Sequence, residues 1–207
     1  HMRLTGKERF FIGIDEVGRG PLAGPVAVCA LAATPTALRR FRTIKESKQL
    51  TPKARALWDE RIRSAAGEDL SFAVSFVSAG VVDRKGISAA IRLALARSLK
   101  KLALSPESVC VLLDGGLHAP PVYKRQVTII RGDAEESAIA MASVVAKVAR
   151  DRLMDRQDAV YPEYGFLRHK GYGSALHVAA IRRYGLSPLH RATFCTRMRK
   201  GKAAGKS

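Results

Sequence analysis

One stretch of sequence decides the fold of this chain: Phe11-Ile12-Gly13-Ile14-Asp15-Glu16-Val17-Gly18-Arg19-Gly20-Pro21-Leu22-Ala23-Gly24-Pro25-Val26. The apolar residues before Asp15 are typical of a buried strand. The glycines and the proline after Glu16 are poorly suited to a central strand, so we expect the chain to turn directly after this residue. Asp15 and Glu16 would then lie at the carboxyl end of a strand, where α/β sheets usually hold their sites.

The whole chain is strongly basic. Its 207 residues carry 36 lysines and arginines against 18 acids, a formal net charge of +18. A polyanion, and nucleic acid first of all, is the partner that this charge indicates. The alternative is a lysine-rich surface kept for solubility. The three cysteines show no zinc-ligand spacing, which fits a reducing cytoplasm, and no apolar run reaches the ~20 residues of a membrane helix.

The pattern of apolar residues predicts an α/β protein with a mixed five-stranded sheet and helices on both faces. Strands are expected at 10–14, 26–33, 70–76, 109–113 and 127–130, and helices at 52–66, 88–104 and 134–158. Short connections between the early strands favour antiparallel pairing, and the later β-α-β units favour parallel pairing. We expect one domain over residues 3–196, with a helical segment from about 161, followed by a disordered basic tail over 197–207.

Carboxylates stand at three of the expected strand ends: Asp15 with Glu16, Asp114, and Asp133. Acids that converge at one edge of a sheet repel one another, and some of them would have to hold a proton. A hard divalent cation removes this conflict, and an all-oxygen ligand set indicates Mg²⁺ or Mn²⁺. Four carboxylates can hold two such ions, which is an arrangement suited to phosphodiester cleavage.

Each acid also has a simpler explanation. Asp114 followed by Gly115 is a turn signal, and Asp133 with Glu136 fits a capping box for the long helix. Asp15 could simply end a strand. The joint occurrence of these acids at three strand ends, in a chain of charge +18, favours a metal site.

The opening stretch resembles the signature of prokaryotic ribonuclease HII. Further matches follow in order along nearly the whole chain: Ser47-Lys48-Gln49-Leu50, Leu113-Asp114-Gly115, Arg131-Gly132-Asp133, residues 142–152, His169-Lys170-Gly171-Tyr172-Gly173-Ser174 and Ser187-Pro188-Leu189-His190-Arg191. Two positions depart from the family pattern, Glu46 in place of Asp and Arg131 in place of Lys. Neither departure affects the four acids.

The resemblance implies a ribonuclease H-like fold and a role for each motif. It makes Asp15, Glu16, Asp114 and Asp133 catalytic acids that hold two Mg²⁺ or Mn²⁺ ions. It makes Gly18-Arg19-Gly20 the loop that reads the ribose 2′-hydroxyl, Lys48 a contact to phosphate, and Tyr172 the aromatic partner at an RNA–DNA junction. The implied protein is a cytoplasmic, monomeric endonuclease. It would hydrolyse RNA in RNA/DNA hybrids and nick 5′ to single ribonucleotides in duplex DNA, leaving 5′-phosphate and 3′-hydroxyl ends.

The residue types of the reading loop suit this role. Glycines let backbone groups approach a sugar, and a 2′-hydroxyl both donates and accepts hydrogen bonds. Nearby, Asp151 is expected to form an ion pair with the arginines beside it in sequence, and His169 and His190 to be packing residues or neighbours of a phosphate.

Two rival functions stay open from the residues alone. One is a different nuclease on the same fold, such as a junction-cleaving enzyme. The other is a basic nucleic-acid-binding protein without catalytic activity, although such a protein has no need of four clustered acids.

Overall fold

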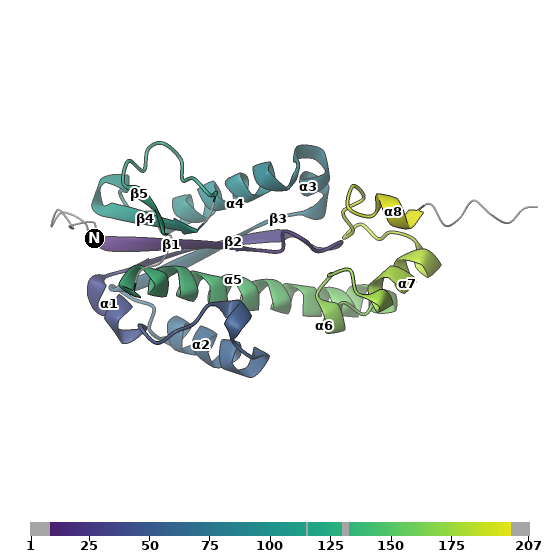
Figure 1. The fold of residues 1–207 in the computed structure, drawn as a ribbon, viewed down its shortest axis with the longest axis horizontal. Helices are drawn as coiled ribbons and strands as arrows, with labels where there is room; N and C mark the ends of the chain where they lie inside the picture. Colours follow the sequence, from purple (N-terminus) through teal and green to yellow (C-terminus); the bar gives the residue numbers. More distant parts are fainter. Residues whose placement is uncertain (1–8, 115, 130–132, 200–207) are drawn as a thin grey trace, which may run out of the picture.

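The computed structural model describes residues 9–114, 116–129 and 133–199, and its centre is the predicted mixed sheet. The strands are β1 (Phe10–Val17), β2 (Val26–Ala33), β3 (Leu70–Val77), β4 (Val109–Asp114) and β5 (Gln126–Ile129). They lie in the order β3-β2-β1-β4-β5 (Figure 1). β2 pairs antiparallel with β1 and with β3, whereas β4 pairs parallel with β1 and with β5. This division between antiparallel early strands and parallel later strands confirms the sequence-based expectation.

The central strand is longer than its sequence predicts. β1 does not stop before the acids but continues through them to Val17, because Glu16 and Val17 still pair with Val28 and Ala27 of β2. The turn therefore begins at Gly18, whose φ of 93° lies in the left-handed region. Asp15 and Glu16 are fixed by sheet pairing and do not belong to the loop that follows.

Helices cover both faces of the sheet (Figure 1). α1 (Pro35–Arg40), α2 (Pro52–Ser64) and the long α5 (Asp133–Val160) cover one face, and α3 (Ala79–Lys85) and α4 (Ile87–Leu102) cover the other. Two hydrophobic clusters, one on each side of the sheet, form the core. α1 and α3 were not predicted, because each is too short to give a clear apolar period.

Gly13 sets how closely α5 approaches the sheet. A Cβ at this position would lie 2.2 Å from the backbone carbonyl carbon of Ala138 and 2.5 Å from the backbone nitrogen of Ile139. The first turns of α5 thus rest directly on the middle of β1, and only glycine leaves room for this contact. α5 runs along β1 in the direction of the strand, because Ala138 lies against Gly13 and Ser143 bonds to Asp15, so Asp133 at its start lies towards the beginning of β1.

The C-terminal part of the chain forms a small helical module at one end of the molecule (Figure 1). It contains the 3-10 turn η3 (Pro162–Tyr164) and the helices α6 (Phe166–His169), α7 (Ala175–Tyr184) and α8 (Thr196–Arg199). Its own core includes Tyr164, Phe166 and Ile181 together with Leu22 and Ala23 of the opening stretch. The expected tail at 197–207 is wrong at its start, because residues 197–199 belong to α8. Residues 200–207 lie outside the described part of the chain.

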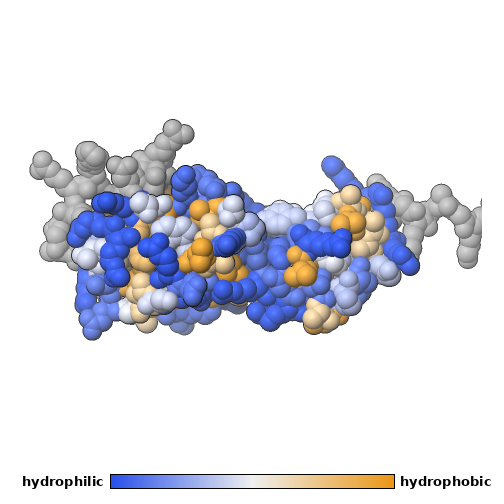
Figure 2. Space-filling model, turned by 90° about the horizontal axis from the view of Figure 1, so that it is seen from below, coloured by the Kyte–Doolittle hydropathy of each residue, from blue (hydrophilic) through white to orange (hydrophobic). Residues whose placement is uncertain are grey.

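Figure 2 views the molecule from the side of α2 and α5 and shows a mostly hydrophilic surface with hydrophobic side chains in separate small patches. Among the described helices, none combines the length and the apolar character needed to cross a membrane.

Candidate active site at the end of β1

The structure brings the backbones of Asp15 and Asp114 to one edge of the sheet, whereas Asp133 begins α5 ten residues before Ser143, the residue of this helix that bonds to Asp15. Asp15 lies on β1, and Asp114 follows the Ile14–Leu113 pair of the parallel β1–β4 ladder by one residue. The backbones of Asp15 and Asp114 are therefore neighbours at the ends of adjacent strands. Asp133 is the first residue of α5, the helix that packs on β1 through Gly13. The side chains of Asp114 and Asp133 lie outside the described part of the structure.

Asp15 is held in a partly buried, mixed environment. Burial is the main reason that its pKa rises to about 7, and the charge of Glu16 adds to this rise. A hydrogen bond with the Ser143 side chain and the charge of Lys48 act in the opposite direction. The expectation that one of the acids holds its proton more tightly than usual is supported for Asp15, but burial contributes more than the neighbouring acid does.

Lys48 reaches this site because its loop is attached to α5. The backbone N–H of Ser47 donates to the hydroxyl of Ser143 over 3.2 Å, and the hydroxyls of the two serines are hydrogen-bonded to each other over 2.7 Å. Arg55 adds two hydrogen bonds to the carbonyls of Ser47 and Leu50, at 2.8 and 2.6 Å. The segment forms the 3-10 turn η1 (Ser47–Gln49). These contacts place the positive charge of Lys48 beside Asp15.

Glu16 forms an ion pair with Arg19 of the Gly18–Gly20 loop. Arg19 Nη1 donates to Glu16 Oε1 over 2.9 Å, and the Arg19 side chain is 58% exposed whereas that of Glu16 is 13% exposed. The exposed arginine thus pairs with the largely buried Glu16 carboxylate. A phosphate or a cation that approaches this edge would compete for one of the two partners.

Two buried arginines hold the loop from inside, and no signal in the sequence marks their role. Arg150 of α5 donates to the carbonyls of Pro25, Ala23 and Lys170 at 3.0, 3.1 and 3.0 Å. Arg191, which follows α7, donates to those of Gly24, Arg19 and Gly18 at 3.0, 3.0 and 2.7 Å. Both side chains are fully buried. A buried arginine ordinarily indicates an acidic partner, whereas here the partners are carbonyls, which have no sequence signature.

Asp151 forms an ion pair, but its partner is Lys147 at 2.6 Å and not one of the adjacent arginines. Arg150 is committed to the loop carbonyls, and Arg152 pairs with the buried Asp59 at 3.1 Å. The prediction of a structural pair was therefore right in kind and wrong in partner, because residues next to each other on a helix point in different directions.

Tyr172 is 42% exposed, as the flanking glycines predict. The charged ends of Lys147 and Arg150 lie 6.0 and 5.8 Å from the centre of its ring. Gly171 has a φ of 86°, and its carbonyl accepts a hydrogen bond from the backbone N–H of Leu22 over 2.8 Å. The ring is thus presented by a turn that is attached to the segment following the reading loop.

A chain of hydrogen bonds fixes the backbone of Tyr172. The N–H of Ser187 donates to His190 Nδ1 over 2.9 Å, so the proton of the neutral His190 ring is on Nε2. His190 Nε2 donates to His177 Nε2 over 3.0 Å, and His177 Nδ1 donates to the carbonyl of Tyr172 over 2.9 Å. Burial is the main cause that lowers the pKa of His177 and of His190 to about 4. His190 is therefore a neutral packing residue, which was one of the two roles expected for it.

The donor set fits a hard divalent cation. Asp15 and Glu16 supply only oxygen ligands. Burial disfavours the ionised form of the Asp15 carboxylate, and a bound cation would stabilise that form. Among the described side chains, no group of three or more histidines, cysteines and acids forms a metal cluster. The acids that would complete the predicted set, Asp114 and Asp133, are the ones whose side chains lie outside that part of the structure.

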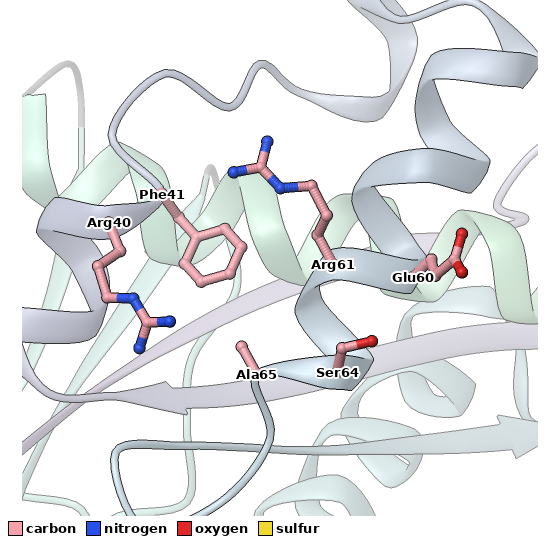
Figure 3. A pocket seen from close by; sticks show the side chains of 6 residues that line it. All are labelled: Arg40, Phe41, Glu60, Arg61, Ser64 and Ala65. Carbon is pink, nitrogen blue, oxygen red and sulfur yellow. The ribbon is translucent and has the colours of Figure 1, made fainter.

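A cavity of about 410 Å³ lies elsewhere, between the ends of α1 and α2 (Figure 3). It is lined by Arg40, Phe41, Glu60, Arg61, Ser64 and Ala65. α1 follows the end of β2, which pairs with the beginning of β1, so this cavity is at the opposite end of the strand from Asp15. It contains none of the predicted site residues.

Comparison with known proteins gives one consistent family. The family model described as Ribonuclease HII matches residues 12–199. A protein named Ribonuclease HII from Lachnoclostridium phytofermentans is 44% identical, over 90% of this chain and 70% of its own length. One with the same name from Synechococcus is also 44% identical, over 90% of this chain and 95% of its own length.

Solved structures show the same fold at lower identity. A chain of the PCNA:RNase HII complex from Archaeoglobus fulgidus has a TM-score of 0.73 and 22% identity, covering 93% of this chain and 98% of that chain. Bst-RNase HIII in complex with Mn²⁺ has a TM-score of 0.73 and 21% identity, covering 96% of this chain and 72% of that chain. The predicted ribonuclease H-like architecture is confirmed.

Proposed function

This chain belongs to the ribonuclease HII family and is a ribonuclease H type endonuclease, and we propose that it hydrolyses RNA in RNA/DNA hybrids and nicks duplex DNA 5′ to single embedded ribonucleotides. The products carry 5′-phosphate and 3′-hydroxyl ends. The observation that carries the proposal is the close succession, on one strand and its turn, of two acids and a Gly-Arg-Gly loop in which Arg19 and Gly20 are exposed. A cleavage site and a sugar-reading site are thus only a few residues apart.

Asp15, Glu16, Asp114 and Asp133 would hold two Mg²⁺ or Mn²⁺ ions. The Mn²⁺ complex of the related RNase HIII fold and the all-oxygen donor set support this choice of metal. When bound, the ions supply an activated water and stabilise the leaving 3′-oxygen. The chain's own contribution is to fix Asp15 and Glu16 by sheet pairing and to set Lys48 beside Asp15 through Ser47 and Ser143.

Substrate selection would fall to the loop and to Tyr172. The backbone of Gly18-Arg19-Gly20 would contact the 2′-hydroxyl, which DNA lacks. Tyr172 would stack on the neighbouring deoxyribose side of the junction, and Lys48 and Arg19 would contact phosphates. The net charge of +18 supports a nucleic-acid substrate. The three cysteines are all buried, which agrees with the proposal of a cytoplasmic protein, and we propose that it acts as a monomer.

The test uses three duplexes of one sequence: a single ribonucleotide in DNA, a full RNA/DNA hybrid, and DNA alone. We expect cleavage of the first two in Mg²⁺ or Mn²⁺, no cleavage of DNA, and no activity after the metal is removed by a chelator. End-labelling of the products identifies the 5′-phosphate and the position of the nick. Cleavage of the all-DNA duplex at a comparable rate would contradict the proposal, and Asp15→Asn prepared in parallel reveals a contaminating nuclease.

A further inference from the structure

The reading loop is held by a charge that has no acidic partner. Within the described part of the chain, Arg191 forms no ion pair, and its fully buried guanidinium spends three N–H groups on loop carbonyls. Asp83, whose charge opposes the lowering of the Arg191 pKa by burial, is itself occupied by the backbone N–H groups of Ala192 and Thr193. Burying a guanidinium against carbonyls alone costs free energy, because no opposite charge compensates for the lost hydration. A role in fixing the orientation of these carbonyls would explain why the arginine is there.

Two of these carbonyls belong to consecutive peptide groups. Arg191 Nη2 binds the carbonyl of Gly18, and Nη1 binds that of Arg19. Because a trans peptide is planar, its N–H points away from its C=O. The two bonds therefore direct the N–H groups of Arg19 and Gly20 away from Arg191. Both residues are exposed, and among the hydrogen bonds of the described residues neither N–H has an acceptor.

The result is a pair of parallel N–H donors that faces solvent. It begins three residues after Glu16, on the side of the loop opposite a buried positive charge. A cation bound to the carbonyl of a peptide polarises that peptide and makes its N–H a better donor. The planar guanidinium fork can hold two adjacent carbonyls at once, and a lysine ammonium cannot match this geometry.

We propose that Arg191 is a positioning residue for substrate recognition: its fork fixes the two peptide planes after Gly18, so that the N–H groups of Arg19 and Gly20 form a preorganised two-donor site for the ribose 2′-oxygen. This inference rests on the proposed function, because it assumes that the loop reads ribose. It adds that the selectivity for ribose depends on a side chain from the opposite end of the chain.

The experiment compares binding of two duplexes of one sequence, with and without a single ribonucleotide, in the absence of metal so that no cleavage occurs. The ratio of the two dissociation constants measures ribose discrimination. In Arg191→Lys we expect this ratio to fall about tenfold, as for the loss of roughly one hydrogen bond, while affinity for the all-DNA duplex is unchanged because the charge is kept.

Two controls separate positioning from general damage. Arg63→Lys likewise exchanges a guanidinium for an ammonium, but the group that Arg63 binds is the carboxylate of Asp59 within α2. Leu95→Ala, in the core on the α4 side of the sheet, lowers stability without approaching the loop. Both controls should keep the wild-type ratio of dissociation constants, including at a loss of thermal stability equal to that of Arg191→Lys. An equal fall in all three variants would overturn the proposal in favour of a purely structural role.

A second measurement uses the wild type and does not depend on the folding of any variant. The amide proton resonances of Arg19 and Gly20 should shift and become protected from exchange with the ribonucleotide duplex, and much less so with the DNA duplex. Equal shifts with both duplexes would overturn the inference. A wild type that binds both duplexes equally would instead contradict the proposed function itself, and it would do so before any variant is made.

Discussion

The two halves of the segment from Asp15 to Gly24 are held in different ways. The acid end is part of β1 and is fixed by backbone pairing with β2, and its neighbour on the other side is β4. The loop end has no strand partner over Gly18–Gly20, and side chains more than a hundred residues away hold it. The acids, which repel each other, are thus built into a sheet, whereas the loop that we propose to bind a sugar is held by hydrogen bonds from side chains.

The acid end should give the largest effect on cleavage and the smallest on folding. Asp15→Asn keeps the shape of the side chain but removes a proposed metal ligand, so we expect activity to fall by more than the roughly 100-fold typical of residues behind the ligands. Because the pKa of Asp15 is raised to about 7, the ionised form is destabilising at pH 8, and the metal-free variant should melt no lower than the wild type. Turnover and thermal midpoint are measured together. Normal cleavage, or an unfolded variant, would contradict this.

The loop end should show the reverse order, with folding affected first. A Cβ at Gly18 would lie 2.5 Å from Arg150 Nε and 2.9 Å from the carbonyl oxygen of Pro25, at a φ of 93°. Gly18→Ala should therefore cost at least about 2 kcal/mol of stability, including roughly 1–2 kcal/mol for the left-handed backbone. Gly20→Ala is the matched control, because no atom lies within 4 Å of its Cβ.

Gly20→Ala should change stability by less than about 0.5 kcal/mol, as is usual at exposed positions. If it nevertheless raises KM for the ribonucleotide substrate, the substrate itself approaches this Cβ. Equal losses of stability in the two alanine variants, measured by chemical denaturation, would show that the loop is not held as the structure describes.

Tyr172 tests whether the loop acts alone in recognition. Tyr172→Ala should lose a stacking contribution of about 1–3 kcal/mol, by analogy with proteins that bind single strands. The fall in kcat/KM should be larger for substrates with an RNA–DNA junction than for a uniform RNA/DNA hybrid. Arg19→Ala should weaken both substrates, because a phosphate contact does not depend on the neighbouring sugar. Tyr172→Phe, which keeps the ring, serves as the control, and kcat/KM on both substrates is the measurement. Equal losses for Tyr172→Ala would assign the ring to general binding.

The smallest effect concerns the histidine chain behind Tyr172, and it appears as a pH dependence of stability. The pKa of His177 is lowered to about 4 in the folded chain. The unfolded chain therefore binds a proton at this residue near pH 6.5, whereas the folded chain stays neutral there until the pH approaches 4. Stability is therefore fully present above pH 6.5 and falls as the pH drops towards 4. One such histidine contributes about 1.4 kcal/mol of loss at pH 5.5. In His177→Gln the loss between pH 7 and 5.5 should be smaller by this amount, and an unchanged loss would refute the neutral chain.

The contrast between the strand and the loop also explains which features of the structure could be predicted from the sequence. The five strands and their pairing directions follow from apolar runs and turn residues, which are local signals, and they were predicted. The short helices α1 and α3 were missed for lack of a period. The exact end of β1 was missed because pairing with β2 outweighs the turn signal at Gly18.

The supports of the loop were missed for a different reason. Arg150 and Arg191 bind main-chain carbonyls, and every residue has one, so no pattern of residue types marks the contact. The partners of His177 and His190 are likewise two backbone groups and each other. Such contacts are specific in space and almost invisible in a single sequence.

The clamp by Arg191 also has a consequence for the order in which the molecule is made. Arg191 follows Arg19 by 172 residues, so the ribosome produces Asp15, Glu16 and the Gly18–Gly20 loop long before Arg191. A nascent or truncated chain that ends before Arg191 carries the acids but has no guanidinium to align Arg19 and Gly20. If the loop reads ribose as proposed, its selectivity would be acquired only after Arg191 has been made, and a product that ends earlier would lack it.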